Sequence, residues 1–151
     1  MKLDMYQVDA FSKKVFGGNP AAVCPLDEWL PDEIMQSIAL ENQLSETAFF
    51  VKEGTDFHLR WFTPAFEIDL CGHATLASAH VLYQHLGHQG PIVFHTRSGP
   101  LLVEQAGEKY FMKLPSRPPK SDPGPANVAE ALGIKPLDSR ISRDYFFCLR
   151  V

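Results

Sequence analysis

The segment from Ala74 to Leu86 restricts the fold of this chain more than any other. It contains no Asp, Glu, Lys or Arg, and its apolar side chains would lie on most sides of a helix. A helix that is apolar over most of its circumference is usually enclosed by other elements. Gly87 follows at the position of a left-handed helix C-cap. The sequence therefore predicts a central helix wrapped by strands, in a chain of the α+β class.

Short strand-like runs lie on both sides of this segment. They are rich in apolar and aromatic residues and are separated by turn residues, which is typical of successive strands. A second, amphipathic helix is predicted to begin at Pro31, because proline and acidic residues suit a first turn. Leu30, Ile34 and Ile38 form its expected apolar stripe. The expected strands cover residues 2–11, 21–24, 47–51, 58–63, 92–96, 101–105 and 110–114.

A proline-rich stretch divides the chain. Five prolines between residues 115 and 125 leave little room for a regular element, so the stretch is interpreted as a linker. The expected organisation is a first β-roll domain over 1–115, a linker over 116–125 and the incomplete start of a second domain over 126–151. Within that last part we expect a short helix at 126–132, capped by Gly133, and one strand at 144–151.

Composition limits the classes of partner. The formal net charge is −4, and the Lys and Arg residues are scattered, which argues against a nucleic-acid partner. Because the chain has no long uncharged apolar run and no signal-peptide core, we expect no membrane partner. Three cysteines without CxxC spacing fit free thiols in a reducing cytoplasm.

Glu46 is the first candidate for chemistry. It stands at the entrance to the apolar run Thr47 to Phe50. Burial raises the pKa of a carboxylate, which makes it a usable acid and base near neutral pH. From this segment alone, a solvated glutamate at the end of a strand is the favoured interpretation.

The second candidate site is Asp69 to Ala74, at the start of the enclosed helix. Free amides at a helix N-terminus bind anions, and Gly72 would let a carboxylate approach. His73 could donate a hydrogen bond or move a proton, and Cys71 near the positive end of the helix dipole could have a lowered pKa. A small buried cysteine and a capping histidine are the structural alternatives.

Metal binding has weaker support in the sequence. Cys71-x-His73 and His85-x-x-His88 come nearest to ligand spacing, and no HExxH or zinc-deaminase pattern is present. We therefore predict no metal site.

Taken together, several ordered motifs over the first hundred or so residues resemble the PhzF-like (phenazine biosynthesis) isomerase family. They also resemble the diaminopimelate epimerases, which share its fold. The matching stretches are Phe16-Gly17-Gly18-Asn19-Pro20-Ala21-Ala22-Val23, Asn42-Gln43-Leu44-Ser45-Glu46-Thr47-Ala48-Phe49, Arg60-Trp61-Phe62-Thr63-Pro64, Glu67-Ile68-Asp69-Leu70-Cys71-Gly72-His73-Ala74-Thr75 and Thr96-Arg97-Ser98-Gly99-Pro100-Leu101.

The resemblance implies a fold of two pseudo-symmetric halves, each a β-roll around a central helix, with the active site between them. It implies that Glu46 is the catalytic acid and base and that Gly72 and His73 bind substrate, without a metal or an organic cofactor. Asn19 and Ser45, within the matching motifs, are further candidate substrate-binding residues.

Cys71 is a candidate substrate-binding residue as well. It occupies the position of an epimerase cysteine, although Gly-His follows it here where those enzymes have Gly-Asn.

The resemblance covers an amino-terminal half. Family members are longer, so we expect a truncation, a fragment or a natural half with an incomplete site. The leading hypothesis is a cofactor-independent isomerase or epimerase that moves a proton on a small carboxylated metabolite. The alternatives are a non-catalytic binding or assembly module with the same roll, and a cysteine-based racemase that uses Cys71. A homodimer is the expected assembly.

Overall fold

A computed structural model describes residues 2–14 and 16–150. Contacts between Cα atoms divide the chain into two compact units, Met1–Pro115 and Ser116–Val151. The division falls at the start of the proline-rich stretch. Residues 1 and 151, which end the expected domains and the expected last strand, lie outside the described residues.

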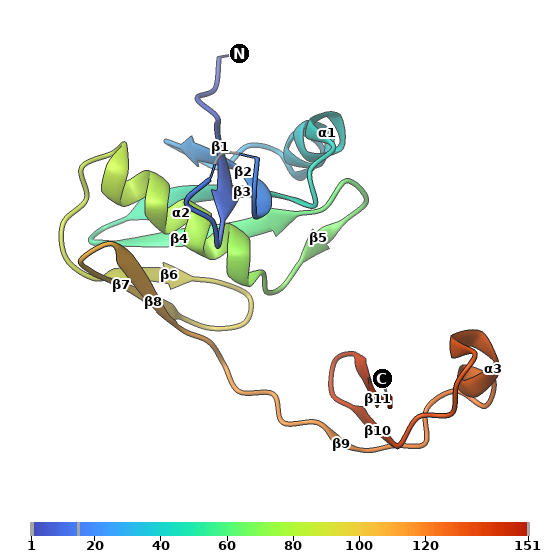
Figure 1. Cartoon of the computed structure of the whole chain (residues 1–151). Helices are drawn as coiled ribbons and strands as arrows, with labels where there is room; N and C mark the ends of the chain where they lie inside the picture. Colours follow the sequence, from blue (N-terminus) through green and yellow to red (C-terminus); the bar gives the residue numbers. More distant parts are fainter. Residues whose placement is uncertain (1, 15, 151) are drawn as a thin grey trace. The chain divides into compact units, whose positions relative to one another are not determined.

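The first unit is an eight-stranded sheet curled around one helix, α2 (Gly72–Gln84) (Figure 1). Its path is β1-β2-β3-β4-β6-β7-β8, with β5 added to β4. Neighbouring strands are antiparallel except β2 with β3 and β4 with β6. The strands are β1 (Tyr6–Ala10), β2 (Asn19–Leu26), β3 (Glu46–Glu53), β4 (Asp56–Phe62), β5 (Glu67–Ile68), β6 (Ile92–His95), β7 (Leu101–Ala106) and β8 (Lys109–Lys113).

Two helices cover opposite faces of this sheet, and each lies in the connection between the two strands of a parallel pair. Parallel neighbours need a crossover connection, and α1 (Asp32–Asn42) joins β2 to β3 while α2 lies between β4 and β6. Strand β3 serves both faces: Ala48 and Phe50 pack with α2, whereas Phe49 and Val51 pack with α1. Burial on both faces explains why the run at 48–51 is continuously apolar.

The enclosed helix is confirmed. Ala74, Ala77 and Ala79 are at most 1% exposed, and the polar Thr75 and Ser78 are fully buried. The hydroxyls of Thr75 and Ser78 donate to backbone carbonyls one turn earlier, which satisfies them inside the roll. These small side chains let the helix lie close to the strands. The expected α+β roll around a central helix is therefore the observed fold.

The expected stripe of α1 is only partly correct. Met35 and Ala39 are its buried residues, Leu30 and Ile38 are partly buried against the same core, and Ile34 is 39% exposed. The contact face is centred one residue beyond Ile34, because Met35 and Ala39 are four apart and lie one above the other.

The second unit contains more regular structure than the sequence predicts. It has α3 (Val128–Leu132) and a three-stranded antiparallel sheet of β9 (Lys120–Ser121), β10 (Asp138–Ile141) and β11 (Tyr145–Cys148). The expectation of a single strand was wrong, because β10 has a weak apolar pattern. The expectation that 116–125 holds no regular element was wrong at β9, which lies at a sheet edge between prolines, where proline is tolerated. The expected last strand pairs with β10 inside its own unit.

No helix in the described part of the chain is both long enough and apolar enough to cross a membrane.

Candidate active site

Glu46 is the first residue of β3. It lies opposite Ala21 of the parallel strand β2, so its place is set by two neighbouring strands. Its side chain is 16% exposed. The solvated glutamate that the sequence left open is therefore not what the fold produces.

Cys71, Gly72 and His73 begin the enclosed helix. Cys71 is its N-cap residue, with an extended backbone, and Gly72 is its first residue. Cys71 is 7% exposed and His73 is 9% exposed. The helix start is therefore buried against the roll, as the enclosed character of α2 requires.

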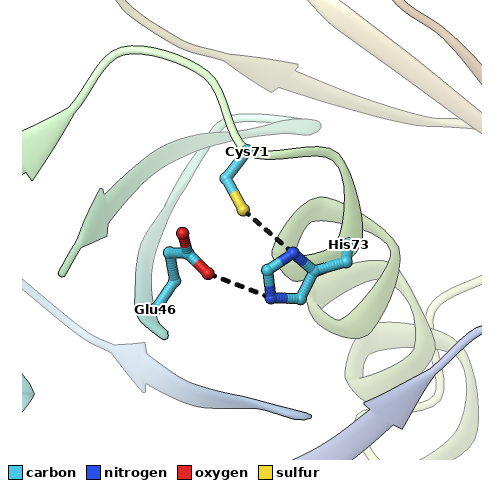
Figure 2. A group of neighbouring side chains, drawn as sticks. All are labelled: Glu46, Cys71 and His73. Atoms are coloured by element: carbon cyan, nitrogen blue, oxygen red, sulfur yellow. Dashed lines mark hydrogen bonds and ion pairs between the residues drawn. The ribbon is translucent and has the colours of Figure 1, made fainter. Parts of the chain in front are cut away.

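The imidazole of His73 lies between the other two side chains (Figure 2). Its Nε2 is 3.1 Å from Oε2 of Glu46, and its Nδ1 is 3.4 Å from Sγ of Cys71. The approach of Glu46 to His73 is an ion-pair contact without hydrogen-bond alignment, so among the described residues both atoms are buried and lack a hydrogen bond. The three residues form one continuous cluster, which we call the Glu-His-Cys cluster.

Burial controls the thiol of Cys71. Loss of solvent raises the pKa of Cys71 to about 12, and the neighbouring Glu46 carboxylate adds to this rise. The backbone amides of His73 and Ala74 act in the opposite direction but do not offset burial. The expectation of a lowered pKa at the helix N-terminus was therefore wrong, because the dipole of α2 acts on a thiol that is out of water.

The remaining predicted residues lie near the cluster along the chain. Asn19 begins β2, two residues before the partner of Glu46, and is partly buried. Ser45 precedes Glu46 and is exposed. Gly72 adjoins Met112 of β8, where an added Cβ would meet Cε at 3.7 Å, an ordinary contact. Steric need at that point does not explain why residue 72 is glycine.

Sequence reasoning missed the side chains that support the cluster. Asn42, at the end of α1, donates from Nδ2 to Oγ1 of Thr47, the residue after Glu46, at 3.1 Å. Ser98 donates to the backbone carbonyl of Asp69 at 2.7 Å and so ties down the loop before Cys71. Both Asn42 and Ser98 fall within the quoted motifs, which was the available signal.

A charged group fixes the strand that leads into the helix. Glu67 of β5 accepts two hydrogen bonds from Arg60, at 2.7 Å each, and lies 2.6 Å from an Arg97 nitrogen. Arg60 also pairs with Asp32 of α1 at 2.9 Å. Because β5 has only two residues, these ion pairs add to its pairing with β4 and to the packing of Ile68 against the core.

The side chains of the cluster also offer ligand atoms of the kinds that bind metal ions. One ligand atom from each of Glu46, Cys71 and His73 lies within 4.8 Å of the others. The sequence offered only the Cys71-x-His73 pair, because the third donor arrives from β3.

Comparison with known proteins places this geometry in a family context. The model of the PhzC-PhzF family, described as phenazine biosynthesis-like protein, matches residues 8–132. An uncharacterized isomerase of Pseudomonas aeruginosa is 51% identical over 146 residues, which are 96% of this chain and 56% of that protein. The chain therefore spans little more than half the length of this relative.

Two solved structures superpose on this chain. The crystal structure of a phenazine biosynthesis protein of the PhzF family from Enterococcus faecalis is 49% identical and superposes with a TM-score of 0.86 over 99% of this chain and 58% of that one. A predicted epimerase from Pseudomonas aeruginosa, 23% identical, superposes with a TM-score of 0.73 over 93% of this chain and 56% of that one, which indicates a shared fold.

Proposed function

The chain belongs to the PhzC-PhzF family of phenazine biosynthesis-like proteins, and on that premise we propose that it forms the amino-terminal half of a cofactor-independent isomerase. The reaction proposed is the movement of a proton from one carbon to another on a small carboxylated molecule. The relative from Pseudomonas aeruginosa carries the name isomerase, which supports this class of reaction.

The observation that carries the proposal is the approach of Glu46 to His73. Their side chains are 16% and 10% exposed and lie 3.1 Å apart, although the residues come from a strand and a helix far apart in sequence. In the proposed step, the Glu46 carboxylate takes a proton from an acidified carbon, and the electron pair of that C–H bond passes into an enolate. The resulting carboxylic acid then returns the proton to another carbon, which completes a general acid–base cycle.

The start of α2 would hold the negative charge of the substrate. Backbone amides at a helix N-terminus and the imidazole of His73 are donors that are fixed before the reaction, and such donors stabilise a developing enolate. Gly72 would present its amide without a side chain in front of it. Asn19 and Ser45 are proposed to contact the rest of the substrate. Asn19 lies two residues before Ala21, which pairs with Glu46, and Ser45 immediately precedes Glu46.

A cysteine-based racemase is the second candidate, since Sγ of Cys71 contacts His73. A racemase of that kind needs a thiol that can lose its proton near neutral pH. The raised pKa of Cys71 weighs against that role and favours Glu46 as the proton carrier. A homodimer and a cytoplasmic location remain predictions.

Deuterium incorporation tests the proposal. The complete protein that contains this half would be incubated in heavy water with small carboxylated candidate substrates, and mass spectrometry would follow the carbon-bound hydrogens. We expect deuterium to enter carbon in the native protein but not in Glu46→Gln. If no substrate exchanges in the native protein, while small carboxylates still bind, the chain is a non-catalytic binding module.

A further inference from the structure

The Glu-His-Cys cluster combines three kinds of donor atom: a carboxylate oxygen, an imidazole nitrogen and a sulfur (Figure 2). We propose that Glu46, Cys71 and His73 bind one divalent cation of the Zn²⁺ type and that this cation blocks the site. Neither the sequence spacing nor the family comparison assigns a metal to these residues. Binding of the cation is independent of the proposed function, and only its blocking effect rests on that function.

The distances fit a tetrahedral cation after small movements. Zinc binds sulfur at about 2.3 Å and nitrogen or oxygen at about 2.0 to 2.2 Å, so tetrahedral ligands lie about 3.4 to 3.6 Å from one another. Sγ of Cys71 is already 3.4 Å from Nδ1 of His73. All three ligand atoms lie within 4.8 Å of one another, so side-chain rotation of Glu46 would complete three corners.

Two buried atoms of the cluster lack hydrogen bonds, which is a separate indication of a ligand. Oε2 of Glu46 and Nε2 of His73 are both without an aligned partner among the described residues. Buried polar atoms in native proteins are normally satisfied, and each exception needs an explanation. A cation bound to the carboxylate and to Nδ1 of His73, the ring nitrogen beside Cys71, would satisfy Oε2 of Glu46 directly but would not coordinate Nε2.

Charge balance favours a divalent ion. A thiolate from Cys71, a carboxylate from Glu46 and a neutral His73 carry two negative charges, which one divalent cation neutralises in a site that is largely out of water. The thiol proton leaves to solvent when sulfur coordinates, because a bound metal deprotonates a thiol. Sulfur and imidazole select zinc-like ions over Mg²⁺ and Ca²⁺, which prefer sites made of oxygen.

The site is accessible from the side of Glu46, whose side chain is 16% exposed. Three protein ligands leave a fourth corner for water. A cation held there occupies the carboxylate that the proposed reaction needs for its proton. Zinc should therefore stop deuterium incorporation by the complete protein, and EDTA should restore it. A protein that incorporates no deuterium at all would contradict the proposed function and leave the binding test unaffected.

Cobalt binding to this chain is the direct test. Co²⁺ occupies zinc sites and gives a near-ultraviolet charge-transfer band when it binds a thiolate. The untagged 151-residue chain, with a reductant that contains no thiol, would be titrated with Co²⁺ and followed by absorbance. We expect this band to saturate at one Co²⁺ per chain and to disappear when Zn²⁺ is added.

Variants locate the ion. Cys71→Ser should abolish the band, and Glu46→Gln should weaken Co²⁺ binding at least about tenfold, whereas Cys148→Ser, at the exposed cysteine of the second unit, should leave the band unchanged. The proposal is overturned if the folded native chain gives no band in excess Co²⁺, or if the band survives Cys71→Ser. Should Cys71→Ser not fold, an unchanged affinity in Glu46→Gln overturns it equally.

Discussion

Glu67→Gln should destabilise the first unit strongly, although it alters only one atom of one side chain. Glu67 is 11% exposed at its side chain and receives Arg60, which is 13% exposed, through two hydrogen bonds. These bonds to Glu67 are the main cause of the raised pKa of Arg60. Glutamine removes the negative charge and turns an amide N–H towards one guanidinium donor.

The expected loss in the free energy of unfolding follows from the contacts that Glu67 makes with Arg60. A hydrogen bond to a charged group contributes about 1.5 to 3 kcal/mol, and removing one partner of a buried ion pair costs about 3 to 5 kcal/mol. Arg60 keeps a second partner, Asp32, but the side chain of that residue is 67% exposed and compensates only in part. We therefore expect a loss of about 2 to 4 kcal/mol in the free energy of unfolding, a large share of the total for a domain of this size.

Urea unfolding followed by circular dichroism would measure this loss. The matched control is Glu108→Gln, which removes the same charge from the ion pair of Glu108 with Lys13, where both side chains are more than 80% exposed. That variant should unfold as the native chain does, since exposed pairs contribute little. Equal urea midpoints for Glu67→Gln and Glu108→Gln would refute the reasoning, because burial would then not change what an ion pair contributes to the free energy of unfolding.

Three further predictions concern the site and the two units. Glu46→Gln should lower turnover of the complete protein at least about a hundredfold, or ~2.7 kcal/mol of barrier, without loss of folding, and a decrease below about tenfold would remove Glu46 from the mechanism. Iodoacetamide at pH 8 should label one thiol rapidly, the exposed Cys148, because burial raises the pKa of both Cys24 and Cys71 to about 12; mass spectrometry that found Cys71 labelled as fast would contradict this. A chain ending at Pro115 should keep the urea midpoint of the first unit, because both apolar cores lie within residues 3–112; a fall in that midpoint would show that residues 116–151 contribute to its stability.

Local patterns in the sequence predicted most elements of the first unit. Strand and helix signals act over a few neighbouring residues, so the enclosed helix and most of the strands around it could be anticipated. Gly87 does adopt a left-handed conformation, but the helix ends earlier, at Gln84, and His85 is its C-cap residue. β10 was missed because its Asp-Ser-Arg-Ile sequence has too little apolar character, and its pairing with β9 and β11 supplies the stability.

The sequence by itself determined that α2 is enclosed, because a helix that is apolar on most sides and has no acidic or basic residue other than histidine is buried by other elements. It also determined, through its motifs, the family and Glu46, Gly72 and His73 as the candidates for chemistry. Only the tertiary structure decided that Glu46 meets His73, since the parallel pairing of β2 with β3 sets the position of the carboxylate. It likewise decided the pKa of the Cys71 thiol. The helix dipole could be anticipated from neighbouring residues, but the burial that raises this pKa comes from the tertiary structure.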